Sequence, residues 1–304
     1  MSRLAGGAAF RVALLLATAL AVLASHAMAA DLPVPSQAEW AGAKKTVTLG
    51  NGVTIAYVET GDSEGPPLLL LHGQGDTSRS WSLMAPFLPK RRLMAVDLRG
   101  HGSSSAPACC YGLQDLADDA GLFLEALGVL KVDVAGHGFG AVAAQLLAAE
   151  HPEKVGALVL VSATTAVEGG PGSPRWDAVM GLAEPVDPAG PFMKERVAVQ
   201  NPVDEAFLSQ VRTEGAAVPL EVWQGMQWGA ATGDVGPVAG AVKAPVMVLW
   251  GEMDQVFDLP HQEKLERAYP EAEFQVFANA GHRLLWEFPE KSAKLIDEFL
   301  GAQP

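Results

Sequence analysis

The 304-residue sequence is poor in cysteine and in positive charge. Its two cysteines, Cys109 and Cys110, are adjacent and match no zinc-site spacing. We expect two small loop residues there, while a redox pair and a replacement nucleophile stay open as alternatives. Lysine and arginine number 21 against 35 acidic residues, which gives a formal net charge of −14. So acidic a surface repels nucleic acid and anionic membranes, and it disfavours both as partners.

Long hydrophobic runs are also missing, except near the N-terminus. Arg3 and Arg11 precede an apolar run at residues 12–24, and Ala27-Met28-Ala29 follows it. This order is typical of a secretory signal peptide with its cleavage site. An uncleaved membrane anchor is the alternative, but the run is short for a spanning helix of about 20 residues. The sequence therefore predicts a periplasmic or secreted protein with no stable membrane span after cleavage.

Strand and helix patterns alternate through most of the chain. Apolar runs predict strands at residues 46–49, 53–58, 67–71, 93–96, 132–135, 155–161, 246–250 and 274–277. Helical patterns lie at residues 81–88, 112–128, 141–147, 260–268 and 289–300. The first two strands flank Gly50-Asn51-Gly52, a hairpin turn signal. We expect an α/β fold with a mostly parallel central sheet, an N-terminal hairpin and helices on both faces.

The alternation is lost between residues 163 and 242, which are rich in glycine and proline. This stretch holds Trp176, Trp223 and Trp228, which either pack the segment's own small core or line an apolar substrate pocket. The expected organisation is a signal peptide at 1–29, a loose leader at 30–43, a core formed by 44–162 and 243–304, and an inserted cap at 163–242.

A strand, a glycine-rich corner and a helix follow one another at residues 132–147. Gly136 and Gly140 are small enough to let the strand and the helix approach closely. The spacing is that of a nucleophile elbow, in which the central residue carries the attacking atom. That central residue is Gly138, which has no side chain.

With this elbow the chain resembles the α/β-hydrolase superfamily, in its esterase-like branch with one domain and a cap. The resemblance covers about residues 46–300 and depends on several landmarks in the family's order. They are His72-Gly73-Gln74-Gly75, the segment 97–102, the elbow, the segment 251–254 and Gly281-His282.

The resemblance implies a role for each landmark. Asp254 is the acid that orients the imidazole of His282, and His282 is the general base. The backbone N–H groups of Gln74 and Phe139 form the oxyanion hole. The competing interpretations are that Asp254 caps the following helix or binds loop amides, and that His282 is a surface histidine. The resemblance implies a small-molecule substrate or ligand, expected to be apolar, and neither a cofactor nor a metal.

The glycine at the nucleophile position leaves three interpretations open. The chain descends from a serine-dependent hydrolase and is nearly inactive, or Asp254 and His282 activate a water molecule instead. Alternatively, catalysis is lost and the protein is a non-catalytic binder of small molecules. A non-glycine residue in the strained elbow costs about 1–3 kcal/mol, so Gly138 relaxes the corner while it removes the attacking atom.

Overall fold

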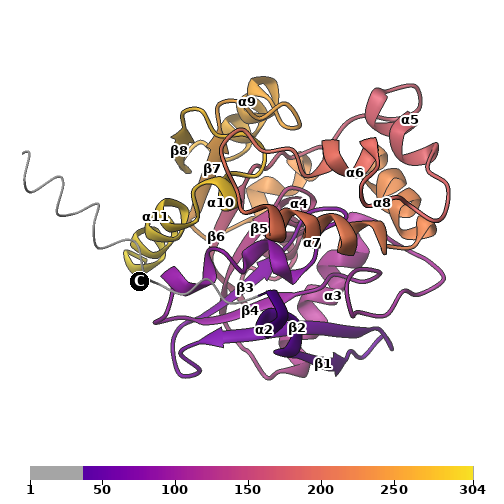
Figure 1. Ribbon diagram of the computed structural model, residues 1–304. Helices are drawn as coiled ribbons and strands as arrows, with labels where there is room; N and C mark the ends of the chain where they lie inside the picture. Colours follow the sequence, from indigo (N-terminus) through magenta and orange to yellow (C-terminus); the bar gives the residue numbers. More distant parts are fainter. Residues whose placement is uncertain (1–36, 304) are drawn as a thin grey trace, which may run out of the picture. The chain divides into compact units, whose positions relative to one another are not determined.

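The computed structural model describes residues 37–303, and the expected signal peptide lies outside them. An eight-stranded sheet forms the centre of this part of the chain (Figure 1). Its strands are β1 (Lys44–Thr48), β2 (Thr54–Gly61), β3 (Pro67–Leu71), β4 (Arg92–Val96), β5 (Val132–His137), β6 (Val155–Val161), β7 (Val246–Gly251) and β8 (Glu273–Phe277). Their order is β1-β2-β4-β3-β5-β6-β7-β8. Only the β1–β2 and β2–β4 pairs are antiparallel, so the mostly parallel sheet with an N-terminal hairpin is confirmed.

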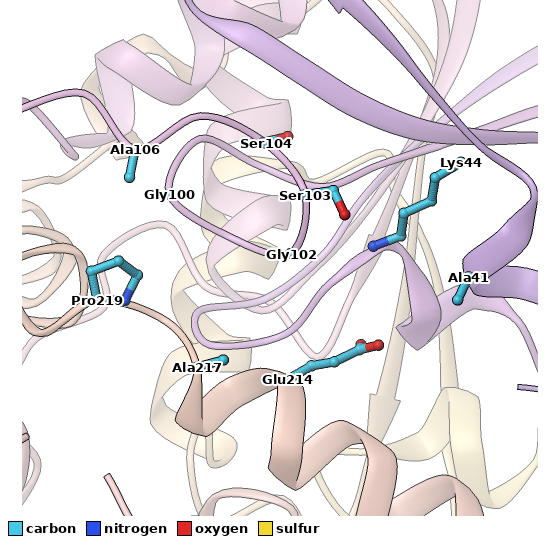
Figure 2. A pocket seen from close by; sticks show the side chains of 10 residues that line it. All are labelled: Ala41, Lys44, Gly100, Gly102, Ser103, Ser104, Ala106, Glu214, Ala217 and Pro219. Atoms are coloured by element: carbon cyan, nitrogen blue, oxygen red, sulfur yellow. The ribbon is translucent and has the colours of Figure 1, made fainter. Parts of the chain in front are cut away.

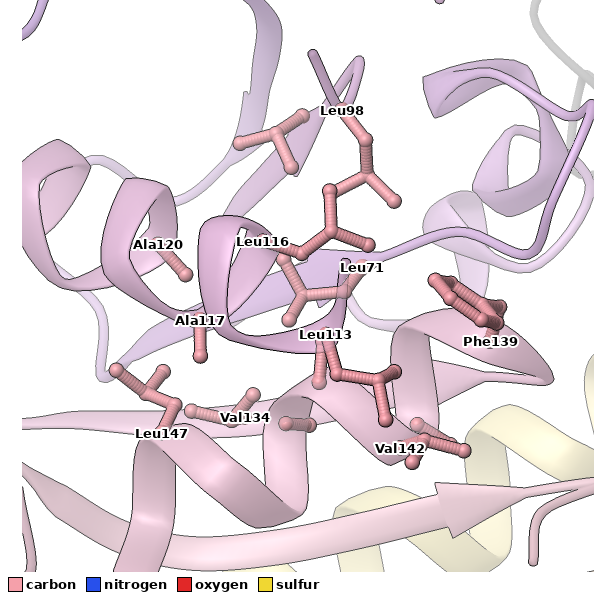
Figure 3. Packing of buried hydrophobic residues seen from close by; sticks show 14 of the residues in the cluster. Leu71, Leu98, Leu113, Leu116, Ala117, Ala120, Val134, Phe139, Val142 and Leu147 are labelled. Atoms are coloured by element: carbon pink, nitrogen blue, oxygen red, sulfur yellow. The ribbon is translucent and has the colours of Figure 1, made fainter. Parts of the chain in front are cut away.

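Helices cover both faces of the sheet because successive residues of its buried strands point to opposite sides. Leu69 and Leu71 of β3 pack with α3 (Leu113–Ala126), α4 (Phe139–Glu150) and α9 (Leu259–Ala268). Figure 3 shows α3 and α4 meeting over this core, with the ring of Phe139 at its edge. Leu68 and Leu70 belong to a second core with α10 (Leu284–Glu287) and α11 (Pro289–Gly301). The two cores hold the strand ends and loops of the site in fixed positions.

Two expectations differ from the structure. The helix expected at residues 81–88 is instead a pair of 3₁₀ turns, η1 (Ser78–Trp81) and η2 (Ala85–Phe87), because Pro86 lacks the N–H that a continuous helix needs. The expected loose leader contains helix α2 (Gln37–Gly42). Trp40 of α2 is buried and its indole donates a hydrogen bond to the Ser78 hydroxyl, so the end of the leader packs on the core.

The segment between β6 and β7 is helical. It contains α5 (Pro174–Met180), α6 (Pro191–Arg196), α7 (Glu205–Ala216), α8 (Leu220–Thr232) and the 3₁₀ turn η3 (Gly236–Ala241). Figure 1 shows α5, α6 and α8 grouped together beside the sheet. None of the helices of residues 37–303 is long and apolar enough to cross a bilayer.

Candidate active site

The corner at Gly138 joins β5 to α4 in a single residue. Gly138 has a φ of +56° and a ψ of −120°, a backbone conformation that side chains rarely adopt. Its neighbours are crowded: a Cβ on Gly136 would lie 2.5 Å from the Ala141 Cα, and one on Gly140 would lie 2.4 Å from the His72 carbonyl oxygen. Both flanking positions therefore need glycine, and the corner has the sharp strand–turn–helix geometry that the spacing predicts.

Asp254 and His282 meet at the carboxyl ends of neighbouring strands. Asp254 follows β7 and His282 follows β8, and the His282 Nδ1 lies 2.9 Å from the Asp254 Oδ2. The other carboxylate oxygen, Oδ1, accepts hydrogen bonds from the backbone N–H groups of Val256 at 2.8 Å and Phe257 at 2.9 Å. Asp254 thus binds loop amides, as the competing interpretation has it, and also holds the imidazole. Its side chain is fully buried, while that of His282 is 16% exposed.

The surroundings favour a neutral imidazole beside an ionised carboxylate. Burial lowers the pKa of His282, although the charge of Asp254 opposes this shift. Burial alone would raise the pKa of Asp254, but His282 and the two backbone N–H groups outweigh it and leave that pKa below its usual value. With Nδ1–H directed at Asp254, the lone pair of Nε2 is free to accept a proton.

That lone pair faces the corner. A Cβ placed on Gly138 would lie 3.4 Å from the His282 Nε2 and 3.8 Å from the Gly73 Cα. A hydroxyl one bond further out would be within hydrogen-bond reach of the imidazole. The structure therefore brings together the side chains of Asp254 and His282 and the corner at Gly138, the positions predicted for the acid, the base and the nucleophile.

Two backbone N–H groups at the corner are without acceptors. Phe139 is the first residue of α4, so its N–H has no partner within the helix. Within residues 37–303 neither this N–H nor that of Gln74 donates a hydrogen bond. The loop of Gln74 is held by His101, whose Nε2 accepts the Gly75 N–H at 3.1 Å. These are the two groups predicted to form the oxyanion hole, and they are free to bind a ligand.

The three tryptophans of the inserted segment occupy different places. Trp223 of α8 is buried, and a Cβ on Gly75 would lie 1.9 Å from its ring, so the indole covers the Gln74 loop. Trp176 and Trp228 contact each other edge to face at 4.6 Å, and Trp228 is 52% exposed. Trp223 thus contacts the loop that carries a predicted oxyanion donor, and a pocket-lining role for the three residues stays a prediction.

Three arginines, which sequence patterns did not indicate, gather around the same loop. Arg175 of α5 donates to the Gln74 side-chain oxygen at 2.9 Å, and Arg196 of α6 donates to the Gln74 carbonyl oxygen at 2.7 Å. Arg283 pairs with the buried Asp76 at 2.5 Å and donates to the Arg196 carbonyl oxygen at 2.7 Å. The position of Arg283 directly after His282 was the one signal that could have found it.

His137, between Gly136 and Gly138, is hydrogen-bonded to the backbone of the predicted base. Its Nε2–H donates to the His282 carbonyl oxygen at 2.9 Å. Burial, aided by the nearby imidazole of His282, lowers the pKa of His137 to about 3, so it is neutral at physiological pH. The neutral ring ties the loop of His282 to the end of β5.

Other features lie apart from this constellation. One cavity has a volume of about 330 Å³. Figure 2 shows the residues that line it: Ala41, Lys44, Gly100, Gly102, Ser103, Ser104, Ala106, Glu214, Ala217 and Pro219. None of these residues belongs to the corner, the acid or the base. Cys109 and Cys110 are exposed free thiols in the loop before α3. In the part of the chain that the structure describes, no group of three or more His, Cys, Asp or Glu side chains is arranged to hold a metal ion.

Known proteins with the same architecture are numerous. Over 83% of its length this chain is 28% identical to 2-hydroxy-6-oxononadienedioate/2-hydroxy-6-oxononatrienedioate hydrolase of Paraburkholderia phymatum, 92% of which is covered. It is also 28% identical, over 81% of its length, to the AB hydrolase superfamily protein YisY of Bacillus subtilis, of which 95% is covered.

Solved structures agree with these relatives. A hydrolase from Pseudomonas aeruginosa superposes with a TM-score of 0.74 at 25% identity, over 86% of this chain and 99% of that one. A membrane phospholipase A described as a bacterial virulence factor gives a TM-score of 0.74 at 26% identity, over 96% and 97%. The family model of the alpha/beta hydrolase fold matches residues 66–289, which span the corner, the acid and the base. The chain therefore belongs to the α/β-hydrolase family.

Proposed function

We propose that this protein acts on ester-like or other carbonyl-containing small molecules, or descends from a hydrolase that did, and that its own activity is low. In this proposal His282 is the general base, Asp254 orients it, and the N–H groups of Gln74 and Phe139 bind the oxyanion. The observation that carries the proposal is the 3.4 Å between the His282 Nε2 and the position of a Cβ on Gly138. An imidazole with no catalytic use has no reason to face that position while a buried carboxylate orients it.

Without a nucleophile on the protein, the remaining route uses water. His282 takes a proton from a water molecule as its oxygen attacks the substrate carbonyl carbon, and the N–H groups of Gln74 and Phe139 stabilise the resulting oxyanion. The tetrahedral intermediate then collapses to the carboxylic acid and expels the alkoxide, which takes the proton from His282 and leaves as the alcohol. General base catalysis contributes about 10²–10⁴-fold, far less than a complete triad.

The proposal also covers the parts that surround the site. The segment 163–242 acts as a cap that closes over the substrate, with Trp176, Trp223 and Trp228 as apolar walls. Cleavage after Ala29 releases the protein to the periplasm or the medium. N-terminal sequencing of the protein recovered from the periplasm and the medium tests export, since it should begin at Ala30.

Turnover of p-nitrophenyl acetate and p-nitrophenyl butyrate tests the proposed function. We expect the unaltered protein to be slow and Gly138→Ser to be at least about 100-fold faster, because the serine hydroxyl would complete the triad. Gly138→Ala is the matched control, since it adds the Cβ without the hydroxyl. Removing the base from the active variant, as Gly138→Ser with His282→Ala, should return the rate to that of the control.

The alternative function is small-molecule binding without catalysis, and it predicts that Gly138→Ser does not hydrolyse the p-nitrophenyl esters. Gly138 favours it, because a binding protein gains a relaxed corner and needs no attacking atom. If neither the unaltered protein nor Gly138→Ser hydrolyses any ester, although the variant is folded, the hydrolase proposal is refuted.

A further inference from the structure

Arg175 and Arg196 place two positive charges beside Gln74. Within residues 37–303 each guanidinium group donates its one hydrogen bond to Gln74, through Nη2, and that of Arg196 also lies 5.4 Å from the centre of the Trp223 ring. Neither forms an ion pair with any carboxylate of residues 37–303. Every other buried or half-buried arginine of residues 37–303 forms an ion pair with a carboxylate. These arginines are Arg79, Arg91, Arg92, Arg99, Arg212 and Arg283.

The two guanidinium groups also contain nitrogen atoms that lack a hydrogen-bond partner within residues 37–303. The Nε of Arg175 and that of Arg196 are buried and have no hydrogen-bond partner within the described residues. Burial lowers the pKa of Arg196 to about 9, and the neighbouring charges of Arg175 and Arg283 add to the effect. Both groups remain cations at neutral pH. The two side chains are only partly buried, but a charge with a buried, unbonded Nε and no ion-pair partner is still costly, so their retention points to an anion that binds there.

The carboxylates near the Gln74 loop are already paired, although carboxylates are in excess over the whole chain. The protein has a formal net charge of −14, so carboxylates are abundant. Around the Gln74 loop, however, Asp76 is already paired with Arg283, and Asp254 is already paired with His282. Asp254, Asp76 and Glu195 act on the two arginines only at a distance, and within residues 37–303 no carboxylate forms an ion pair with either of them.

We propose that Arg175 and Arg196 bind a carboxylate on the substrate, which makes the substrate class esters or related carbonyl compounds that carry a free carboxylate. The planar guanidinium group matches a carboxylate in shape and can bind both of its oxygens. This inference rests on the proposed function for the reacting carbonyl, but binding of the anion does not depend on catalysis. It narrows the expectation of an apolar ligand, because one end of the substrate is anionic.

The contacts also place the carboxylate close to the chemistry. Arg175 and Arg196 are both hydrogen-bonded to Gln74, whose N–H is a proposed oxyanion donor. A substrate carboxylate bound by them would lie within a few bonds of the reacting carbonyl. Short half-esters of dicarboxylic acids have this arrangement.

Calorimetry on the protein without its signal peptide tests the binding step directly. Monomethyl succinate and methyl butyrate are similar in size and differ in the carboxylate. We expect the half-ester to bind at least about 10-fold more tightly, as charge-assisted hydrogen bonds imply. Equal affinity for the two esters would refute the inference, as would inorganic phosphate binding as tightly as the half-ester at matched ionic strength.

Variants separate substrate binding from a merely structural role. In Gly138→Ser, pH-stat assays should show that Arg175→Gln or Arg196→Gln lowers kcat/KM for monomethyl succinate by about 10-fold to 100-fold, mainly through KM, and leaves methyl butyrate almost unchanged. Arg267→Gln, at an exposed arginine of α9, is the matched control and should change neither rate. Equal losses for both esters would mean that the arginines only position Gln74, which would overturn the proposal.

The outcomes keep the two proposals apart. Tight binding of the half-ester with no turnover by Gly138→Ser would refute the hydrolase function and leave the carboxylate site standing. Turnover of both esters by Gly138→Ser at the same kcat/KM would support the hydrolase function and refute the carboxylate site. If an arginine variant fails to fold, the preference of the unaltered protein for the half-ester decides.

Discussion

Restoring a side chain at Gly138 should lower the stability of the protein while it raises the activity. The backbone there has a φ of +56° and a ψ of −120°, and residues other than glycine pay about 1–3 kcal/mol in such conformations. Steric clashes add little to this backbone strain, because the nearest atoms to a Cβ on Gly138 lie at 3.4 Å and 3.8 Å. Gly138→Ala should therefore lose about 1–3 kcal/mol in the free energy of unfolding.

Gly138→Ser should lose less than Gly138→Ala. Its hydroxyl can donate to the His282 Nε2, and one such hydrogen bond contributes about 0.5–1.5 kcal/mol. Urea denaturation followed by tryptophan fluorescence gives both free energies, and each kcal/mol should also lower Tm by about 2–4 °C in a body of this size.

The control for this comparison is Gly301→Ala. A Cβ there meets no atom within 4 Å, and Gly301 ends the helix α11, so alanine should be neutral or slightly stabilising. The reasoning is refuted if Gly138→Ala unfolds at the same urea concentration as the parent. In that case the corner would carry no strain, and relief of strain would not be a reason for glycine at this position.

Further predictions concern the acid, the base and two buried histidines. In Gly138→Ser, Asp254→Asn should lower kcat by about 10³–10⁴-fold in steady-state assays, because the imidazole loses the partner that fixes its tautomer. The kcat/KM of Gly138→Ser should rise with pH to a plateau and reach half its maximum below pH 6.5, since the pKa of His282 is lowered and the neutral form is the base. Burial lowers the pKa of both His101 and His137 to about 3, so between pH 3 and 6.5 the unfolded chain binds more protons. Below pH 6.5 the free energy of unfolding should therefore fall by about 1.4 kcal/mol per pH unit for each of them, as urea titrations at pH 7.5 and 5.5 would measure.

The sheet was predictable from sequence because its central strands are covered on both faces. The expected strands at 67–71 and 155–161 coincide with β3 and β6, whose uninterrupted apolar runs are typical of strands that are buried on both faces. Prediction failed where a local pattern conflicted with one residue or with tertiary packing. Pro86 broke an expected helix, and burial of Trp40 organised the end of an expected loose leader.

Some residues of the site could likewise be predicted from the sequence, and others could not. The positions of Asp254, His282 and Gly138 follow from landmarks that each come directly after a strand, so the sheet brings them together. Arg175 and Arg196 could not be predicted, because their partner Gln74 lies 101 and 122 residues away in sequence. Their meeting depends on how the inserted helices fold, and no periodicity of the sequence encodes that.

The contact between Trp223 and Gly75 makes the Gln74 loop dependent on helix α8. The indole lies where any side chain at Gly75 would clash, and the Trp223 carbonyl oxygen accepts a hydrogen bond from the Gln74 side chain. The backbone donor of Gln74 is therefore positioned by a helix far away in sequence, and a substitution that loosens the packing of α8 should lower the turnover of a restored serine without touching the acid, the base or the corner.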